Sequence, residues 1–444
     1  MRVISAAVGM YDIMEQRITI VESIDKKRAP FDMPVVYLLA PTRESVDKLI
    51  RDYSGGDKVL YKGHAFLYFL ERLPDDLLSL IKNCRPLLKR VKALTEINID
   101  FLVKEERAFN FDMPKAFPAF YLRKQTTPIE LAIAEKLVTV CATLNEYPHI
   151  RYKQSSAIAT SLANVFHLKM DEYVAANPNW WYHGGPQKNS LAQRERGTLL
   201  LMDRADDCLT PLMHDFTYQT MVHDLIKMDD DRITYQSETT NDPSQTQAKD
   251  VLLDERDSLW VELRGKHIAE VIETLSNRIR EIMNSSTGSA LGSKKSGNMS
   301  LSQMAAALKA LPEYREVMSK LSQHMHIAHE CMDVFKKESL LDLSDLEQTL
   351  ATGKDEDGRA PRMTEIVDKM EKAIMNMKSK KARLRLILIA TISQGGLRQQ
   401  DRRRLISAAE LSRKDIRTLN ALEIMGLSIF ASSDKNKLVS MMSG

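Results

Sequence analysis

Residues 197–226 read GTLLLMDRADDCLTPLMHDFTYQTMVHDLI, and no other stretch carries as much information about the fold. An apolar run at 198–202 has the composition of a buried strand, and it delivers Asp203 and Arg204 to its end. A polar turn with two further acids, Asp206 and Asp207, leads into a segment rich in aromatic residues and methionines. The pattern predicts either a catalytic acid cluster or a turn that fixes one element against another.

The composition is that of an ordinary soluble protein. The chain has 444 residues, a net charge of +3 and 43% hydrophobic residues, which excludes a disordered chain and allows two to four domains. Its four cysteines are far apart and form no CxxC pair, which indicates a reducing compartment and argues against disulfide scaffolding and structural zinc. No apolar run reaches 18 residues, so we expect a cytoplasmic protein without a transmembrane segment.

The first hundred residues alternate apolar runs with helical patterns. Strands are predicted at 35–40, 65–70 and 97–103, with helices over 46–53 and from Pro74 to Val91. Strand–helix–strand repetition of this kind predicts a parallel sheet with helices on its faces.

A second α/β unit is predicted from residue 104. Thr127-Pro128-Ile129-Glu130 has the spacing of a capping box that opens a helix. A further helix is expected from about Ser155 and a loop over 177–186, before the strand at 198–202.

After about residue 215 the pattern is almost wholly helical. The Ser- and Gly-rich stretch 284–298 predicts a mobile loop after a helix that begins near Ile268. Apolar residues then recur every three or four positions from Met304 to Phe335, which predicts an internally packed, nearly heptad seam. Pro312 lies inside this seam and is expected to kink the helix, giving a bent helical hairpin.

A basic run at 378–417 could bind nucleic acid or acidic lipid. Apolar residues at 384–392 in its middle favour instead a buried helix with charged, solvated ends.

The sequence shows no complete set of catalytic residues. Asp203, Asp206 and Asp207 follow a strand, as magnesium ligands of a hydrolase or transferase do, but no GxGxxG or GxxxxGK[ST] loop accompanies them. His324, His326 and His329 resemble a metal-binding tract, yet positions i and i+2 of a helix point to different faces. The prediction is a protein with no catalytic residue, no cofactor and no metal, and the magnesium enzyme is the alternative.

The segment from residue 199 to 226 resembles the signature of the SM (Sec/Munc) family, the syntaxin-binding proteins of SNARE-mediated vesicle fusion. The positions that carry the resemblance are Asp203, Arg204, Thr210, Pro211, His214 and Phe216, followed by Thr217, Tyr218, Gln219, Met221, Asp224 and Leu225. Segments 12–31, 35–53, 94–102, 140–152, 251–271 and 301–328 agree in the same order. The chain is most similar to the exocytic, plasma-membrane branch of the family.

The resemblance implies an arch-shaped fold with two α/β parallel-sheet domains and a large, mainly helical domain with a projecting, kinked helical hairpin. The implied domains are 1–103, 104–215 and 216–444. It also implies a chain shortened at both ends, without the first strand of domain one and the C-terminal part of domain two. The sheet around residues 198–202 is then expected to have unpaired edges.

The resemblance further implies a non-enzymatic SNARE regulator, a monomer that enters a heterocomplex with syntaxin and with the assembling SNARE complex, including the vesicle SNARE. Nucleic acid is not an expected partner, and the protein is expected in the cytoplasm, recruited to the plasma membrane through syntaxin. The matching positions are Glu22, Lys26 and Lys27 for the syntaxin cleft, Leu78, Leu94 and Glu96 for the pocket of the syntaxin N-terminal peptide, and Pro312 and Met325 for the hairpin that templates SNARE helices.

Overall fold

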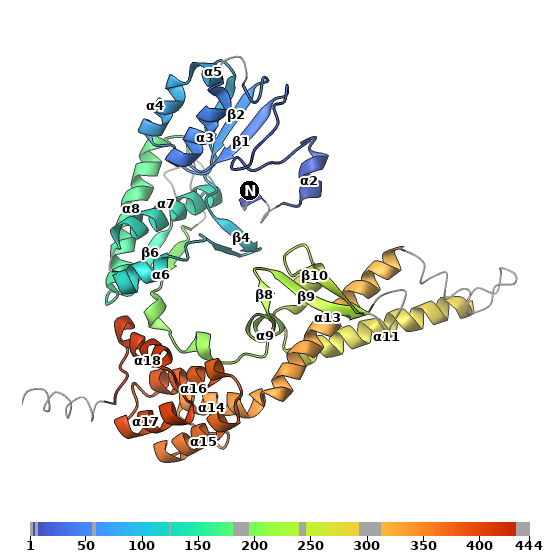
Figure 1. Ribbon diagram of the computed structural model, residues 1–444, viewed down its shortest axis with the longest axis vertical. Helices are drawn as coiled ribbons and strands as arrows, with labels where there is room; N and C mark the ends of the chain where they lie inside the picture. Colours follow the sequence, from blue (N-terminus) through green and yellow to red (C-terminus); the bar gives the residue numbers. More distant parts are fainter. Residues whose placement is uncertain are drawn as a thin grey trace, which may run out of the picture. The chain divides into compact units, whose positions relative to one another are not determined.

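The structure is a computed structural model that describes residues 3–4, 8–55, 59–123, 126–180, 195–238, 246–292 and 312–431. The chain divides into two compact units, residues 1–206 and 207–444 (Figure 1). The three-domain division expected from the sequence stays a prediction.

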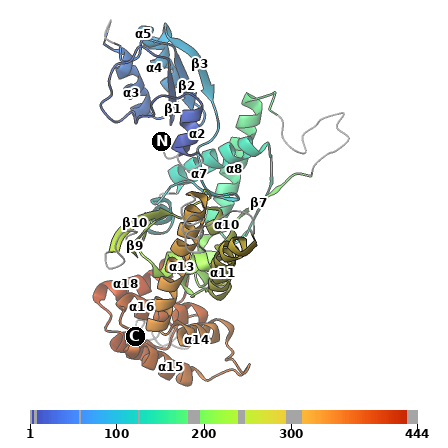
Figure 2. The same ribbon diagram turned by 90° about the vertical axis from the view of Figure 1, so that its right-hand side faces the viewer.

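A three-stranded parallel sheet opens the first unit. Its order is β1–β2–β3, and β1 Val35–Leu39 pairs in register with β2 Ala65–Phe69. Alternate residues of both strands are buried against the connecting helices, and Figure 2 shows these helices beside the sheet. The elements that complete this layer are α3 Arg43–Tyr53, α4 Asp75–Asn83, α5 Arg85–Leu88 and β3 Val91–Glu96. The strands predicted at 35–40 and 65–70 and their parallel arrangement are confirmed.

The third strand was predicted at 97–103, and this is wrong: β3 is Val91–Glu96, and Val91 belongs to it rather than to a helix. The chain leaves the sheet at Asn98, whose φ of 53° lies in the left-handed region, which no strand adopts. The residues that follow form a small antiparallel pair, β4 Leu102–Glu105 with β5 Ala108–Asn110.

The rest of the first unit pairs two long helices with a short sheet. α7 Thr127–Leu144 packs on α8 Ala157–Ala176, and β6 His149–Tyr152 runs parallel to β7 Thr198–Leu201. The capping box predicted at Thr127 is wrong. Thr126 is the N-cap and makes no side-chain cap bond, while the buried Glu130 accepts a hydrogen bond from Ser161 Oγ at 2.8 Å. Glu130 therefore accepts a hydrogen bond from the neighbouring helix α8 instead of capping the N-terminus of its own helix.

The short elements of this unit also include α2 Met10–Glu15, α6 Ala116–Pro118, the π-helical turn Ala119–Arg123 and the 3₁₀ turn Arg204–Asp206. Of the loop predicted at 177–186, residues 181–186 lie outside the described residues.

The second unit contains an antiparallel sheet that the sequence pattern did not predict. β8 Met228–Asp229, β9 Arg232–Glu238 and β10 Thr246–Leu252 form it in the order β10–β9–β8. Ile233 and Tyr235 alternate with polar residues, and both are buried. The prediction of an almost wholly helical region after residue 215 is therefore wrong, because this period-two pattern is short and lies between strong helical patterns.

Two long helices pack together beside this sheet, α11 Ile268–Gly292 and α13 Pro312–Lys337, as both ribbon views show (Figures 1 and 2). The loop predicted at 284–298 is wrong up to Gly292, because the helix continues that far, and residues 293–298 lie outside the described residues. Internal packing of the seam is confirmed for its described part, where Leu321 and Ala328 are buried in the core. The helical elements that line this core also include α9 Tyr218–Leu225 and α10 Ser258–Leu263.

A bundle of helices forms the rest of the second unit and has a core of its own. The middle of the basic run is α16 Lys380–Ser393, and its Leu386, Ile387 and Ile389 are almost fully buried, which confirms a helix with charged ends. The other members are α14 Leu340–Thr352, α15 Met363–Asn376, α17 Gln399–Ala408 and α18 Arg413–Asn420. No described helix is long and apolar enough to cross a membrane.

Candidate functional site

The aspartates after β7 close a turn. Asp203 accepts hydrogen bonds from the hydroxyls of Tyr121 and Ser156, the latter at 2.7 Å, and from its own turn at Ala205 N. Burial alone would raise the pKa of Asp203, but these hydrogen bonds hold it below its ordinary value. Lys153 donates to Asp206 Oδ1 at 2.7 Å. These acids therefore hold β7 to α8 and to the π-helical turn.

Asp207 caps the next turn of the signature segment. Its Oδ1 accepts from the backbone N–H groups of Leu209 and Thr210, at 3.1 and 3.0 Å. The 3₁₀ turn Thr210–Leu212 follows, with Pro211 near its start, where a missing N–H costs nothing. Among the described residues, no group of three or more His, Cys, Asp or Glu side chains is arranged to hold a metal ion.

His214 ties the signature segment to the helical bundle. Glu347 of α14, with a side chain only 1% exposed, accepts from His214 N at 2.9 Å and contacts His214 Nδ1 at 2.8 Å. Arg385 of α16 donates to the backbone oxygen of Leu212 and to both oxygens of Asp224, at 3.0 and 2.7 Å. Two charged side chains, the buried Glu347 and the half-buried Arg385, thus hold residues 212–224 from two helices.

Tyr218 ties the same segment to α13. Its hydroxyl lies 3.0 Å from His324 Nδ1, and the other ring nitrogen of His324 lies 3.3 Å from Asp257 Oδ2. Asp257 is also the N-cap of α10, accepting from Leu259 N and Trp260 N. His324 is fully buried, whereas His326 and His329 are exposed, so the three histidines do face different ways, as the helical spacing predicted.

Phe216 lies where the two cores of the second unit meet. It packs against both, and its ring makes an edge contact with Phe335 at a centroid distance of 5.1 Å. The signature residues His214, Phe216 and Tyr218 therefore act as internal connectors.

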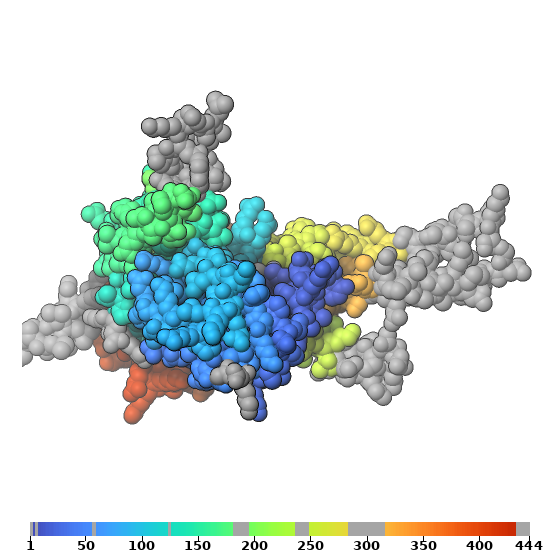
Figure 3. All heavy atoms as spheres, turned by 90° about the horizontal axis from the view of Figure 1, so that it is seen from above, coloured from blue at the N-terminus to red at the C-terminus, as the bar shows by residue number. Residues whose placement is uncertain are grey.

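The predicted cleft residues are solvent-facing. Glu22, Lys26 and Lys27 are exposed and lie in or next to a turn that precedes β1. Figure 3 shows the N-terminal part of the chain, to which this turn belongs, in dark blue. The turn is held by Arg28, whose guanidinium forms two 2.9 Å hydrogen bonds with Asp52. Mixed charges on a fixed, exposed turn suit a contact with a charged helix surface.

The predicted peptide-pocket residues come from α4 and β3. Leu94 is 37% exposed, and Leu78 is half-buried and packs against the core of the first sheet. Glu96 accepts a hydrogen bond from the backbone N–H of Leu73 at 2.8 Å. Its carboxylate therefore fixes the loop between β2 and α4.

The predicted hairpin residues lie on α13. Met325 is half-buried and packs against the core that α11 and α13 share. Pro312 is the first residue of α13 as described. Residues 293–311 before it lie outside the described residues, so the predicted kink stays a prediction.

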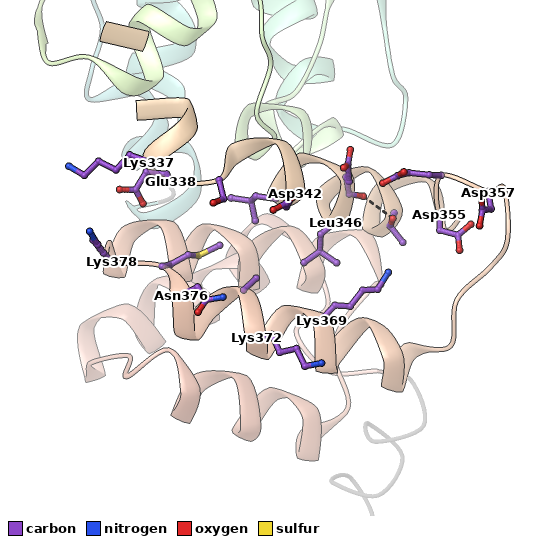
Figure 4. A pocket seen from close by; sticks show the side chains of 17 residues that line it. Lys337, Glu338, Asp342, Leu346, Asp355, Asp357, Lys369, Lys372, Asn376 and Lys378 are labelled. Carbon is purple, nitrogen blue, oxygen red and sulfur yellow. Dashed lines mark hydrogen bonds between the residues drawn. The ribbon is translucent and has the colours of Figure 1, made fainter. Parts of the chain in front are cut away.

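An open groove of about 620 Å³ lies between α14 and α15. Figure 4 shows Asp342 and the loop acids Asp355 and Asp357 along one side, with Lys369 and Lys372 of α15 on the other. The lining has six acids and four lysines, so its charge is mixed and only partly balanced, and the groove is not specific for an anion or a cation.

Comparison with known proteins identifies the family. The sequence profile of the Sec1 family matches residues 1–442. The chain belongs to the Sec1 family. It is 32% identical to "Protein transport protein sec1" of Dictyostelium discoideum, over 99% of the chain and 71% of that protein. It is 30% identical to "SNARE-interacting protein KEULE" of Arabidopsis thaliana, over 97% of the chain and 64% of that protein. The chain thus spans about two thirds of the length of these relatives.

A solved structure has the same fold. The Unc18–syntaxin 1 complex from Monosiga brevicollis matches with a TM-score of 0.83 at 25% identity, covering 97% of this chain and 74% of that chain. The fold of this Sec1-family chain is accordingly a mixed α/β fold of the Unc18 kind, with parallel sheets and many helices. Sec1-family proteins are non-enzymatic regulators of SNARE proteins, which excludes the magnesium-dependent hydrolase or transferase.

Sequence reasoning missed Arg28, Glu347 and Arg385, which are charged residues that the fold buries or half-buries. Each lies in a segment with an ordinary charged pattern, and its partner is distant along the chain. For Glu347, the one usable signal was its place among apolar residues of α14, where a charge needs a buried partner.

Proposed function

We propose that this chain is a syntaxin-binding SNARE regulator that supports vesicle docking, priming and fusion in exocytosis. The observation that carries the proposal is the match of 97% of the chain to an Unc18 protein solved in complex with syntaxin 1. The Arabidopsis relative is named as a SNARE-interacting protein, which favours the same class of partner. Relatives named Sec1 favour the exocytic branch.

The proposed syntaxin contact is the exposed turn with Glu22, Lys26 and Lys27. Helical partners dock in grooves through apolar anchors, and charged rims set the orientation and the association rate. Leu78, Leu94 and Glu96 are the proposed contacts of a syntaxin N-terminal peptide. The exposed side chain of Leu94 supports this role, since a solvent-exposed apolar side chain on β3 can contact an apolar residue of the peptide.

The hairpin of α11 and α13 is the proposed template for SNARE helices during assembly, including the helix of the vesicle SNARE, with Met325 on the contact surface and Pro312 at the bend. Half-burial of Met325 suits this role, because a flexible thioether side chain adapts to different partners. The proposed location is the cytoplasm, with recruitment to the plasma membrane through syntaxin. The arch and its three domains belong to this proposal.

Binding to a panel of syntaxin cytoplasmic domains, each with and without its N-terminal peptide, tests the proposal. We expect saturable binding to at least one member, weakened about tenfold by Lys26→Glu combined with Lys27→Glu, because a rim charge reversal slows association. A matched control is Lys62→Glu, another exposed lysine of the first unit, which should bind normally. Failure of every syntaxin to bind the folded chain would contradict the proposal.

A further inference from the structure

One buried side chain, Arg28, connects the turn that carries Lys26 and Lys27 to α3. Arg28 and Asp52 of α3 form a two-pronged ion pair, and each side chain is only 8% exposed. The hydroxyl of Tyr37 donates to the same Asp52 at 2.7 Å, so the carboxylate is itself held in place. A pair with this geometry is among the more rigid contacts available to a side chain.

Arg28 also reaches back to the turn that precedes it. Its Nη2 donates to the backbone oxygen of Ile24 at 3.3 Å, and its Nε donates to that of Lys26 at 3.4 Å. One guanidinium thus binds the core helix on one side and two carbonyls of the exposed turn on the other. The fork of five donors makes this possible, and no lysine could reproduce it.

Other contacts close the turn at both ends. Lys26 N donates to the backbone oxygen of Ser23 at 3.1 Å, and Lys48 of α3 donates to Asp25 at 2.6 Å. Ile24 packs against the core of the first sheet, and Phe31 pairs with Tyr61 in a backbone bridge. The backbone is anchored while the side chains of Lys26 and Lys27 stay exposed.

We propose that Arg28 is a positioning residue for the partner surface formed by Glu22, Lys26 and Lys27. This inference rests on the proposed function, because it assigns to Arg28 the task of holding the turn in its binding conformation before the partner arrives. A surface that is ordered in advance does not lose conformational freedom on binding, and affinity rises in proportion to the fraction of molecules in the competent form.

The test separates this role from a merely structural one with the double variant Arg28→Met, Asp52→Asn. Replacing a buried pair by neutral groups of similar size preserves stability, and the amide oxygen introduced by Asp52→Asn still offers the Tyr37 hydroxyl an acceptor. The variant loses the bonds to Ile24 and Lys26. We expect a midpoint of thermal unfolding within about 4 °C of wild type. We also expect faster hydrogen exchange at the Lys26 amide, and binding to a syntaxin cytoplasmic domain weakened about tenfold.

The matched control makes the same chemical change on an exposed pair of α3, Arg43→Met with Asp47→Asn. That pair is 67% and 47% exposed, and its members contact each other at 3.0 Å without touching the turn. The control should match wild type in hydrogen exchange and in binding.

The inference is overturned if the Arg28 double variant binds like wild type, or if binding falls with no change in exchange at Lys26. Should the double variant not fold, Arg28→Lys serves instead, because it keeps the charge beside Asp52 but cannot reach both carbonyls. If the folded wild-type chain binds no syntaxin, the proposed function is contradicted, which is a separate result. The comparison of hydrogen exchange at the Lys26 amide then still decides whether Arg28 holds the turn.

Discussion

The signature segment 199–226 and the turn at 22–28 make opposite use of charged residues. In the signature segment, His214 is engaged with the buried Glu347, and Tyr218 with the buried His324, inside the second unit. In the turn, Lys26 and Lys27 face solvent, and the buried charge is Arg28 beneath them. The residues that identify the family therefore hold the fold, whereas the residues proposed to meet the partner look ordinary in the sequence.

The largest expected effect concerns the signature segment, whose charged and polar residues pack inside the fold. Glu347→Ala removes the acceptor of the His214 backbone N–H and the partner of the His214 ring Nδ1 in a buried site, so we expect the free energy of unfolding of the second unit to fall by about 2–4 kcal/mol. Urea denaturation measures it. Gln348→Ala, at the exposed neighbouring position of α14, is the control and should change stability little. A loss below about 1 kcal/mol for Glu347→Ala would show that the signature segment is not held through this pair.

A smaller effect is expected where one hydrogen bond is removed without a charge. Tyr218→Phe leaves the ring in its core and deprives the buried His324 of a partner at 3.0 Å, which should cost about 1–2 kcal/mol. The control is His329→Ala on the exposed face of α13. Equal stability of Tyr218→Phe and wild type would mean that the hydroxyl does not link α9 to α13.

A half-buried acid of the first unit gives the smallest effect and a pH signature. Burial and the neighbouring Asp100 raise the pKa of Glu71 to about 7, with Glu135 adding to the rise and Lys136 opposing it. The stability that a protonated Glu71 confers is complete below the ordinary pKa of about 4.5 and is lost as the pH rises through 7. Glu71→Gln should therefore stabilise the protein by about 1 kcal/mol at pH 8 and by nothing at pH 4.5.

Unfolding of wild type and Glu71→Gln at several pH values checks this, and Glu44→Gln, an exposed acid of α3, is the control. A constant difference between wild type and Glu71→Gln from pH 4.5 to 8 would contradict the assignment.

The sequence predicted what depends on short-range pattern. β1, β2 and α8 follow from apolar runs and helical spacing, and the long signature segment led to the correct family. The partners of Asp203 could not be predicted in this way, because Tyr121 lies 82 positions away and Ser156 47 positions away. Only the fold brings these hydroxyls to the end of β7.

The predictions from the sequence were wrong where the local pattern and the tertiary contacts favour different structures. Glu130 has the spacing of a capping residue, but a hydrogen bond to Ser161 of the next helix prevails. β3 begins at Val91, three residues after α5 ends, so helical and strand patterns run together there. The sheet of β8, β9 and β10 was not predicted because its central strand is short, and Ile233 and Tyr235 are the buried positions among the side chains that the structure describes there.

The most direct test of the comparison is the affinity of the 444-residue chain for syntaxin cytoplasmic domains, measured by calorimetry for wild type, Lys26→Glu with Lys27→Glu, and Thr210→Ala in the exposed signature turn. The account predicts one-to-one binding by wild type, weakening of about tenfold for the lysine variant, and wild-type affinity for the folded Thr210 variant. Wild-type binding by the lysine variant, together with loss of binding in a folded Thr210→Ala chain, would contradict it, because the signature segment would then be the partner surface.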